Sequence, residues 1–181
     1  MRMRYNVLYD FITDNSFKNY VEIGLGKGQT IGFLLKFITD PEFKAWGVDP
    51  FECYKELQTN NAASLKFRKT MHRNQGLVDQ AVNQNPRFTL IKKMSDEAAK
   101  SFEPESIDLV FIDGNHSYKY VLSDIEHWEP IVRKGGIVAG HDYVDNPRNK
   151  YYGVKLAADK YAKEHGFKLE VADNEVWYFR K

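Results

Sequence analysis

The feature that most constrains this chain is a glycine-rich turn that joins a short apolar run to an apolar helix. After residues 19–21 the chain reads Glu22-Ile23-Gly24-Leu25-Gly26-Lys27-Gly28, and Gln29-Thr30 then begin the helix. Glycines at every second position allow the backbone to turn sharply and to approach a bound molecule closely, where any Cβ atom would collide. About twenty residues further on, a second strand ends at Asp49, the position from which a ribose diol is usually held. The two segments together predict a cofactor-binding site.

The spacing of these glycines argues against a nicotinamide or flavin dinucleotide site. That fingerprint requires G-x-G-x-x-G, whereas this chain has G-x-G-x-G, with Gln29 at the next position and Glu22 two residues ahead of the first glycine. A pyrophosphate at the start of the helix would also lie close to the Glu22 carboxylate. A cationic ligand with an amino-acid end and a nucleoside end fits better, and S-adenosylmethionine is such a ligand. A dinucleotide oxidoreductase and a tight βα connection without a ligand remain alternatives.

The composition is that of one ordinary globular domain. With 181 residues, 43% hydrophobic and 28% charged, the chain is long enough for a substantial core, and we expect a single domain over residues 1–181. The net charge of +1 gives no reason to expect a nucleic-acid or membrane surface. The lone cysteine, Cys53, excludes an internal disulfide and a cysteine-based zinc site and indicates a reducing compartment. Because no long apolar segment follows the basic start, the sequence predicts a cytoplasmic protein.

Apolar runs and helical patterns alternate along the chain, which predicts a doubly wound, Rossmann-like α/β sheet, mostly parallel and of about seven strands. Strands are expected over residues 20–24, 45–49, 88–91, 107–113 and 137–139, and helices over residues 5–12, 31–38, 96–102, 118–132 and 154–161. The polar region 54–85 is expected to be mostly helical, with a break at Gly76. The last apolar residues alternate with polar ones on both sides of a short turn at residues 172–174, which predicts an antiparallel C-terminal hairpin.

The reactive side chains of this predicted sheet gather at one edge. Its first, second, fourth and fifth strands end at Glu22-Ile23-Gly24, Asp49, Asp113 and His141-Asp142. Ligands of doubly wound sheets bind outside the carboxyl ends of the strands, near the point where the strand order reverses. We therefore expect the functional site at this edge.

Two of these strand ends carry the residue types that metal binding and proton transfer require. Divalent cations such as Mg²⁺ prefer carboxylate oxygens, so Asp113 and Asp142 are candidate magnesium ligands, with His141 as a ligand for a softer metal. His116 is a candidate general base for a hydroxyl, because an imidazole titrates near neutral pH. Each residue also has a simpler interpretation. Asp113 could cap the next helix or contact the cofactor amine, His116 could be a hydrogen-bonded loop residue, and His141 could pack against the cofactor.

Four segments give the chain a specific resemblance to a known family. They are the glycine turn, residues 47–49, residues 107–118, which end in Asp113-Gly114-Asn115-His116-Ser117-Tyr118, and residues 135–143, which read G-G-I-V-A-G-H-D-Y. Together they resemble a class I S-adenosylmethionine-dependent methyltransferase. They are most similar to the branch that includes macrolide-sugar O-methyltransferases and cephalosporin hydroxylase-like proteins. The resemblance runs from about residue 20 to residue 161.

The resemblance implies that the glycine turn and the ends of the next strands bind the donor. The residues assigned to its methionine part are Glu22, Gly24, Gly26 and Gly28, with Thr30 beside them at the start of the adjoining helix. Asp49 would hold the ribose hydroxyls, Met94 and Ser95 would lie against the adenine, and Asp113 would also contact the donor.

The same resemblance implies catalytic residues and a metal site. His116 would act as the base, and Asp113 would assist catalysis and bind a divalent metal, with Asp142 and His141 as further candidate ligands. Metal-dependent members usually carry two consecutive acidic residues where this chain has His141-Asp142, which leaves the metal requirement open. They also cover the acceptor with additional helices, whereas only about nineteen residues precede the first expected strand here. A partner subunit of a homo-oligomer could complete the pocket.

The expected activity is therefore methyl transfer from S-adenosylmethionine to a hydroxyl oxygen of a small-molecule acceptor, with Mg²⁺ as a candidate second cofactor. A metal-independent methyltransferase and a non-catalytic, S-adenosylmethionine-binding partner subunit are the alternatives. No nucleic-acid or membrane partner is expected. Aromatic residues near the strand ends, among them Tyr143 and Tyr151, could form a wall for a sugar or a phenol.

Overall fold

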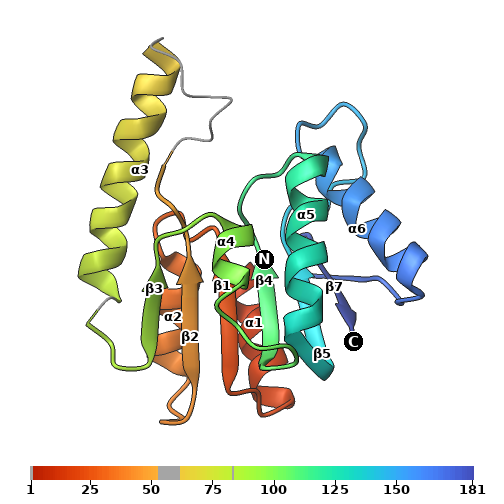
Figure 1. Ribbon diagram of the computed structural model, residues 1–181, viewed down its shortest axis with the longest axis horizontal. Helices are drawn as coiled ribbons and strands as arrows, with labels where there is room; N and C mark the ends of the chain where they lie inside the picture. Colours follow the sequence, from red (N-terminus) through yellow and green to blue (C-terminus); the bar gives the residue numbers. More distant parts are fainter. Residues whose placement is uncertain (1, 53–61, 83) are drawn as a thin grey trace.

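The protein folds around one mixed β-sheet (Figure 1). The computed structural model describes residues 2–52, 62–82 and 84–181. The sheet has seven strands in the order β3-β2-β1-β4-β5-β7-β6. Neighbouring strands among the first five run parallel, and β7 runs antiparallel to both β5 and β6. The predicted doubly wound sheet with an antiparallel C-terminal hairpin is confirmed.

The strands are β1 (Asn19–Ile23), β2 (Lys44–Val48), β3 (Phe88–Ile91), β4 (Ile107–Ile112), β5 (Val132–Gly140), β6 (Glu170–Ala172) and β7 (Val176–Arg180). The helices are α1 (Arg4–Asp14), α2 (Gln29–Phe37), α3 (Ala62–Ala81), α4 (Ser95–Ala99), α5 (Tyr118–Trp128) and α6 (Tyr152–His165), with a short 3₁₀ turn η2 (Glu129–Ile131) after α5. The start of the predicted helical region at residue 54 lies outside the described residues.

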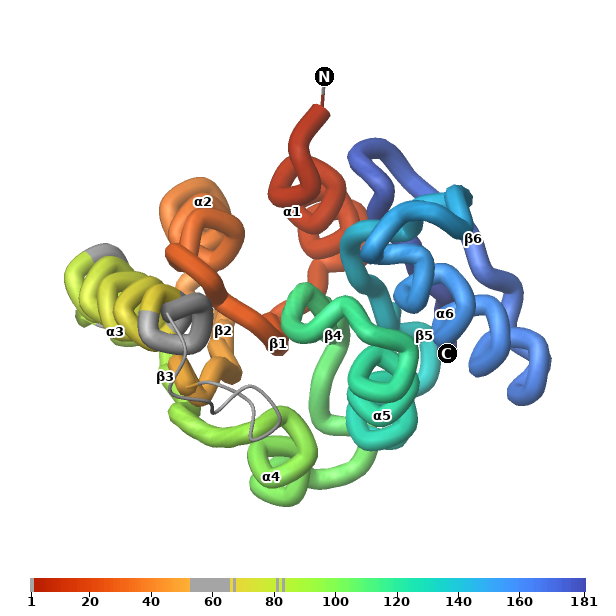
Figure 2. Tube along the Cα trace, turned by 90° about the horizontal axis from the view of Figure 1, so that it is seen from above, coloured from red at the N-terminus to blue at the C-terminus, as the bar shows by residue number. Residues whose placement is uncertain are grey.

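Helices cover both faces of the sheet, as Figure 2 shows from above. The core on one face joins α1, α2 and α3 to alternate strand residues such as Tyr20 and Phe111. The core on the other face joins α4, α5 and α6 to the intervening residues, such as Val21 and Val110. Every residue of β4 is buried, which is why this central strand reads as an almost continuous apolar run.

Two expectations about local structure were wrong. Helix α3 continues through Gly76, because a glycine inside a helix weakens it by only about 1 kcal/mol and does not end it. Strand β5 begins at Val132, before the paired glycines, and Val132 is therefore not part of the preceding helix. At Gly136 a Cβ atom would lie 2.6 Å from the backbone oxygen of Asp108, so this glycine allows β5 to pack closely along β4.

The register of the parallel strands brings their carboxyl ends together. Ile23 pairs with Val48 on one side and with Ile112 on the other, and Ile112 pairs with Gly140. The residues that follow these positions therefore lie side by side at one edge of the sheet. None of the described helices is both long and apolar enough to cross a membrane.

Candidate active site

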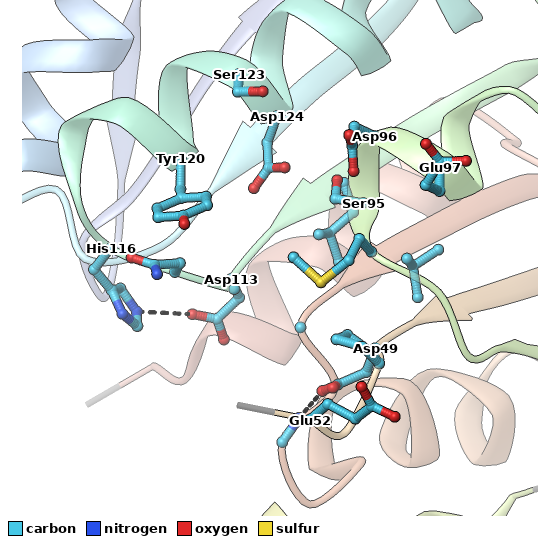
Figure 3. A pocket seen from close by; sticks show the side chains of 18 of the residues that line it. Asp49, Glu52, Ser95, Asp96, Glu97, Asp113, His116, Tyr120, Ser123 and Asp124 are labelled. Carbon is cyan, nitrogen blue, oxygen red and sulfur yellow. Dashed lines mark hydrogen bonds and ion pairs between the residues drawn. The ribbon is translucent and has the colours of Figure 1, made fainter. Parts of the chain in front are cut away.

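A cavity of about 670 Å³ lies at this edge, between the glycine turn, the ends of β2 and β4, and helices α4 and α5 (Figure 3). Its size is ordinary for a site that holds a small molecule or cofactor. The residues named from the sequence that line it are Gly24, Gly26, Asp49, Met94, Ser95, Asp113 and His116. Figure 3 shows Asp49, Asp113 and Asp124 around the same space.

Two glycines of the turn serve different purposes. Gly24 has a φ of +85°, and a Cβ atom there would lie 2.5 Å from the Cα of Gly114, so the turn packs directly on the backbone after β4. Gly26 has a φ of +53°, and a Cβ atom there would meet no atom of the described residues within 4 Å. Because Gly26 lines the cavity, its missing side chain leaves space that a ligand can approach.

Asp49 holds the glycine turn to the end of β2. Its Oδ2 accepts hydrogen bonds from the backbone N–H groups of Leu25 (3.0 Å) and Gly26 (3.4 Å), and its Oδ1 accepts one from Phe51 (2.8 Å). Burial raises the pKa of the Asp49 carboxyl, and these three hydrogen bonds oppose the rise. Asp49 thus orders the turn, and its contact with a ribose stays a prediction.

The remaining residues assigned to the methionine part lie behind the cavity wall. Glu22 is buried and accepts a hydrogen bond from the Tyr20 hydroxyl at 3.2 Å. Burial, with the negative charge of Asp113, raises the pKa of Glu22 to about 8. Thr30 is buried and accepts a hydrogen bond from Nε of Arg4 (3.1 Å), while Gly28 is the N-cap residue of α2 and lies against Val78. None of these three is among the cavity-lining residues of the described chain.

Two carboxylates and two imidazoles converge where β4 and β5 end. Nε2 of His116 lies 2.7 Å from Oδ2 of Asp142 and 3.8 Å from Oδ1 of Asp113. Nδ1 of His141 lies 3.3 Å from Oδ2 of Asp142 and 3.8 Å from the same Asp113 oxygen. The sequence placed all four at one edge of the sheet, and the structure brings them into direct contact.

The charges of this cluster stabilise one another. Burial lowers the pKa of His116, but hydrogen bonds to Asp113 and Asp142 outweigh it and raise this pKa to about 9. The pKa of His141 is also raised, because Asp142 and Asp113 outweigh the effect of burial. Burial works against the ionised form of Asp142, yet the two histidines hold its pKa well below the usual range of an aspartate. The cluster is therefore a set of mutually neutralising charges.

The same cluster has donors that fit a divalent cation. Asp113, His141 and Asp142 each offer one ligand atom, and these three atoms lie within 4.8 Å of one another. A set of two carboxylates and one imidazole is compatible with Mg²⁺ and suits a softer ion such as Mn²⁺ at least as well. An imidazole must be neutral to bind a metal, so the ion would replace a proton on His141.

Helices α4 and α5 form the opposite wall of the cavity. Met94 is 36% exposed and precedes α4, and Ser95 accepts a hydrogen bond from Nε1 of the buried Trp128 at 2.8 Å. Asp124 of α5, which the sequence analysis missed, also lines this wall and is buried. Its burial raises its pKa to about 7, against the effect of a hydrogen bond with Ser95. A charged residue within the apolar stripe of a helix is a signal in the sequence, and Asp124 lies in that stripe between Val121 and Trp128.

Arg4 is the second residue that the sequence analysis missed. Its Nε lies 3.4 Å from Oδ2 of Asp113, although it comes from the first helix of the chain. No local sequence pattern predicts this contact, because it depends on how α1 packs against the sheet.

Comparison with known proteins agrees with this geometry. A family model described as a methyltransferase domain matches residues 21–143. An uncharacterized protein of Acanthamoeba polyphaga mimivirus is 26% identical over 161 residues, which cover 84% of this chain. The match covers 65% of the viral protein, so this chain spans somewhat less than two thirds of that relative's length.

Several solved structures with a similar fold are described as methyltransferases, and one is described as a spermidine synthase. A suggested caffeoyl-CoA O-methyltransferase from Staphylococcus aureus has a TM-score of 0.66 and 16% identity, covering 100% of this chain and 84% of its own. CalS11, a TDP-rhamnose 3′-O-methyltransferase of calicheamicin biosynthesis, has a TM-score of 0.61 and 19% identity. The match covers 97% of this chain and 76% of CalS11. An O-methyltransferase from Bacillus cereus, solved with S-adenosylhomocysteine, has a TM-score of 0.60 and 14% identity. The match covers 98% of this chain and 80% of the Bacillus chain. At these identities the likeness establishes the fold.

Proposed function

We propose that this chain, which belongs to the methyltransferase-domain family and has the class I fold, transfers the methyl group of S-adenosylmethionine to a hydroxyl oxygen of a small molecule. One observation carries the choice of oxygen as the acceptor. His116 lines the cavity beside the glycine turn, and its Nε2 is held 2.7 Å from a carboxylate oxygen of Asp142. A carboxylate that binds one ring nitrogen orients the imidazole and leaves the other nitrogen, here Nδ1, to act as a general base on a hydroxyl.

The cavity has the features that the donor needs. The open space over Gly26 admits a ligand next to the backbone of the turn, and Met94 offers an apolar surface on the other side. Asp49 fixes the turn through its hydrogen bonds to Leu25 and Gly26. We therefore assign the methionine part of the donor to the side of Gly24 and Asp113, and the adenosine part to the side of Asp49, Met94 and Ser95.

The bound donor supplies an electrophilic methyl group on a positively charged sulfur. The protein must hold the acceptor oxygen in line with that methyl carbon and sulfur, which is a task of orientation. His116 takes the hydroxyl proton on Nδ1, the ring nitrogen opposite the one that faces Asp142, as the new oxygen–carbon bond forms and the carbon–sulfur bond breaks. The products are the methylated acceptor, S-adenosylhomocysteine and a proton, which His116 releases to water.

The charge of His116 has to change before it can accept a proton. Its pKa of about 9 favours the protonated ring while Asp113 and Asp142 surround it. The positive sulfonium of the donor opposes that protonated ring, because a nearby like charge lowers the pKa of an imidazolium. Donor binding thus favours the neutral form of His116 that the reaction uses.

A divalent cation fits this proposal as an assistant. Asp113, Asp142 and His141 would hold it, and it would lower the pKa of the acceptor hydroxyl. A metal-independent reaction is the second candidate, and the contact of Arg4 with Asp113 favours it. In that case Arg4 and the two histidines already supply the positive charge that balances the carboxylates.

For the acceptor we propose a sugar or a phenol. The ring of Tyr151 lies with its centroid 4.6 Å from that of His116, so an aromatic surface adjoins the proposed base. Flat sugar faces and phenol rings both pack on such a surface. Two structures of the same fold are described as acting on a sugar nucleotide and on a caffeoyl thioester, which are acceptors of these two kinds.

The test is methyl transfer from isotopically labelled S-adenosylmethionine to a panel of sugars and phenols, with His116→Ala as the variant. A general base contributes about 10²- to 10⁴-fold, so turnover should fall by that factor while affinity for S-adenosylhomocysteine stays within about threefold. The exposed His72 of α3 provides the control, and His72→Ala should keep full turnover.

Other outcomes would reject parts of the proposal. Unchanged turnover in His116→Ala removes this residue from the reaction. Donor binding without transfer to any member of the panel favours a non-catalytic, donor-binding subunit.

A further inference from the structure

Arg4, the first residue of α1, is hydrogen-bonded to the edge of the sheet that carries Asp113, His141 and Asp142. The backbone N–H of Arg4 donates a hydrogen bond to Oδ1 of Asn174 at 3.0 Å. Asn174 lies in the turn between β6 and β7, and the same oxygen lies 3.4 Å from Nε2 of His141. The start of α1 therefore has a defined position beside the carboxylate–imidazole cluster.

The side chain of Arg4 extends from there toward the glycine turn. Its Nε donates a hydrogen bond to Oγ1 of Thr30 at 3.1 Å and lies 3.4 Å from Oδ2 of Asp113. The charge of Arg4 also lowers the pKa of the buried Glu22. The guanidinium thus contacts Asp113, which lines the cavity, although Arg4 and Thr30 are not themselves among the cavity-lining residues of the described chain.

The residues that the structure describes use only a part of the hydrogen-bonding capacity of this guanidinium. Within residues 2–52, 62–82 and 84–181, no group accepts a hydrogen bond from the terminal nitrogens Nη1 and Nη2. The side chain is only 29% exposed, so it is held in place without these bonds. The two terminal nitrogens of an arginine form a fork that matches a carboxylate, and paired, charge-assisted hydrogen bonds to it are strong.

The amino-acid end of the donor carries one group that fits this fork. That end has an α-ammonium and an α-carboxylate, which are opposite charges on neighbouring atoms. Arg4 and Asp113 are likewise opposite charges in contact, and Asp113 lines the cavity beside Gly24. A carboxylate placed beside Asp113 would be repelled without a nearby cation, and Arg4 lies on Oδ2 of Asp113, while His116 and His141 lie on its Oδ1.

We propose that Arg4 binds the α-carboxylate of S-adenosylmethionine and so couples the start of α1 to donor binding, an inference that rests on the proposed function. Arg4 is a binding residue in this account, and it selects donors that keep a carboxylate at the amino-acid end. Its bonds to Thr30 and Asn174 hold it in place before the donor arrives.

The test measures affinity by calorimetry with two ligands, S-adenosylhomocysteine and its decarboxylated analogue, which keeps the amine and the adenosine. The wild-type protein should bind S-adenosylhomocysteine about 10- to 100-fold more tightly, the range expected for a hydrogen bond between charged groups. Arg4→Gln should lower the affinity for S-adenosylhomocysteine by that factor and leave the affinity for the analogue nearly unchanged. The preference for the ligand with the carboxylate should therefore disappear.

Arg2→Gln is the matched control. Arg2 lies two residues earlier and pairs with Asp10 and, at 3.9 Å, with Asp173, so the change removes the same charge away from the site. Both affinities of this variant should equal those of the wild type.

Three results would overturn the inference while leaving the proposed function in place. They are a wild-type protein that binds the two ligands equally, an Arg4→Gln protein that keeps the wild-type preference, and an Arg4→Gln protein that loses affinity for both ligands alike. The first result needs no variant, so a misfolded Arg4→Gln protein cannot hide it. If the wild-type protein binds neither ligand, the proposed function fails and this inference fails with it.

Discussion

The carboxylate of Asp49 accepts a hydrogen bond from the backbone N–H of Leu25 at 3.0 Å, which ties the end of β2 to the turn that follows β1. The same side chain accepts from Gly26 and Phe51 and is buried. One residue therefore holds two of the loops that border the cavity. The shape of the donor site depends on this link as well as on the glycines.

Replacing Asp49 should damage both stability and donor binding. Asp49→Ala leaves three backbone N–H groups without their acceptor, which should cost about 1–3 kcal/mol of unfolding free energy. The loosened turn should also lower the affinity for S-adenosylhomocysteine, measured by calorimetry, at least tenfold. Asp49→Asn keeps one acceptor oxygen and should be intermediate on both measurements. Wild-type values for Asp49→Ala would show that the turn is held by other contacts.

Gly24 and Gly76 should respond to alanine in opposite directions. At Gly24 an added Cβ atom would lie 2.5 Å from Gly114, and its φ of +85° is strained for alanine, so Gly24→Ala should lower stability by about 2 kcal/mol or more. At Gly76, inside α3, a Cβ atom would meet no described residue within 4 Å, and Gly76→Ala should raise stability by about 0.5–1 kcal/mol. Urea unfolding measures both changes. Equal effects of the two substitutions would contradict the tight packing at Gly24.

The strands and the catalytic edge could be predicted because their signals are local. Each strand is a short apolar run, and the polar residue that ends it, such as Asp49 or Asp113, marks the carboxyl edge of the sheet. In a parallel sheet those ends share one edge, so the clustering of Asp113, His116, His141 and Asp142 followed from strand order alone.

Other features could not be predicted because they depend on packing between distant segments. The contact of Arg4 with Asp113 requires the placement of α1 on the sheet, and the roles of Glu22, Gly28 and Thr30 depend on which side chains face the cavity. The continuation of α3 through Gly76 could not be predicted from the low helix propensity of glycine, because this propensity is a weak local preference. The burial of Asp124 depends on which face of α5 packs against the sheet and on its contact with Ser95 from another helix.

Asp124 should make stability depend on pH. Its pKa is about 7 in the folded protein, against an ordinary value of 3.8, so the folded state binds the proton more tightly than the unfolded state does. Stability should therefore fall as pH rises from about 4 to about 7 and level off above, by at most roughly 4 kcal/mol. Asp124→Asn should remove this contribution, which urea unfolding between pH 4 and 8 would detect.

The exposed Asp145 provides the control for that series. Asp145→Asn should leave the pH profile of the wild type unchanged. An Asp124→Asn protein whose stability follows the wild-type profile would show that Asp124 is ionised without penalty in the fold.

Removing divalent cations should separate the two candidate mechanisms. If Asp113, His141 and Asp142 hold a metal that assists the reaction, EDTA should abolish most turnover, and Mg²⁺ or Mn²⁺ should restore it. Asp142→Asn should then weaken Mn²⁺ binding at least tenfold by electron paramagnetic resonance, with Asp145→Asn again unchanged. Full turnover in EDTA would reject metal assistance and favour the arrangement in which Arg4 and the histidines balance the carboxylates.

The most direct test of the whole account is a calorimetric titration of the wild-type protein with S-adenosylhomocysteine and, separately, with NAD⁺. We expect saturable binding of one S-adenosylhomocysteine per chain and no binding of the dinucleotide. Absence of S-adenosylhomocysteine binding, or preference for NAD⁺, would contradict the assignment of this cavity to the methyl donor.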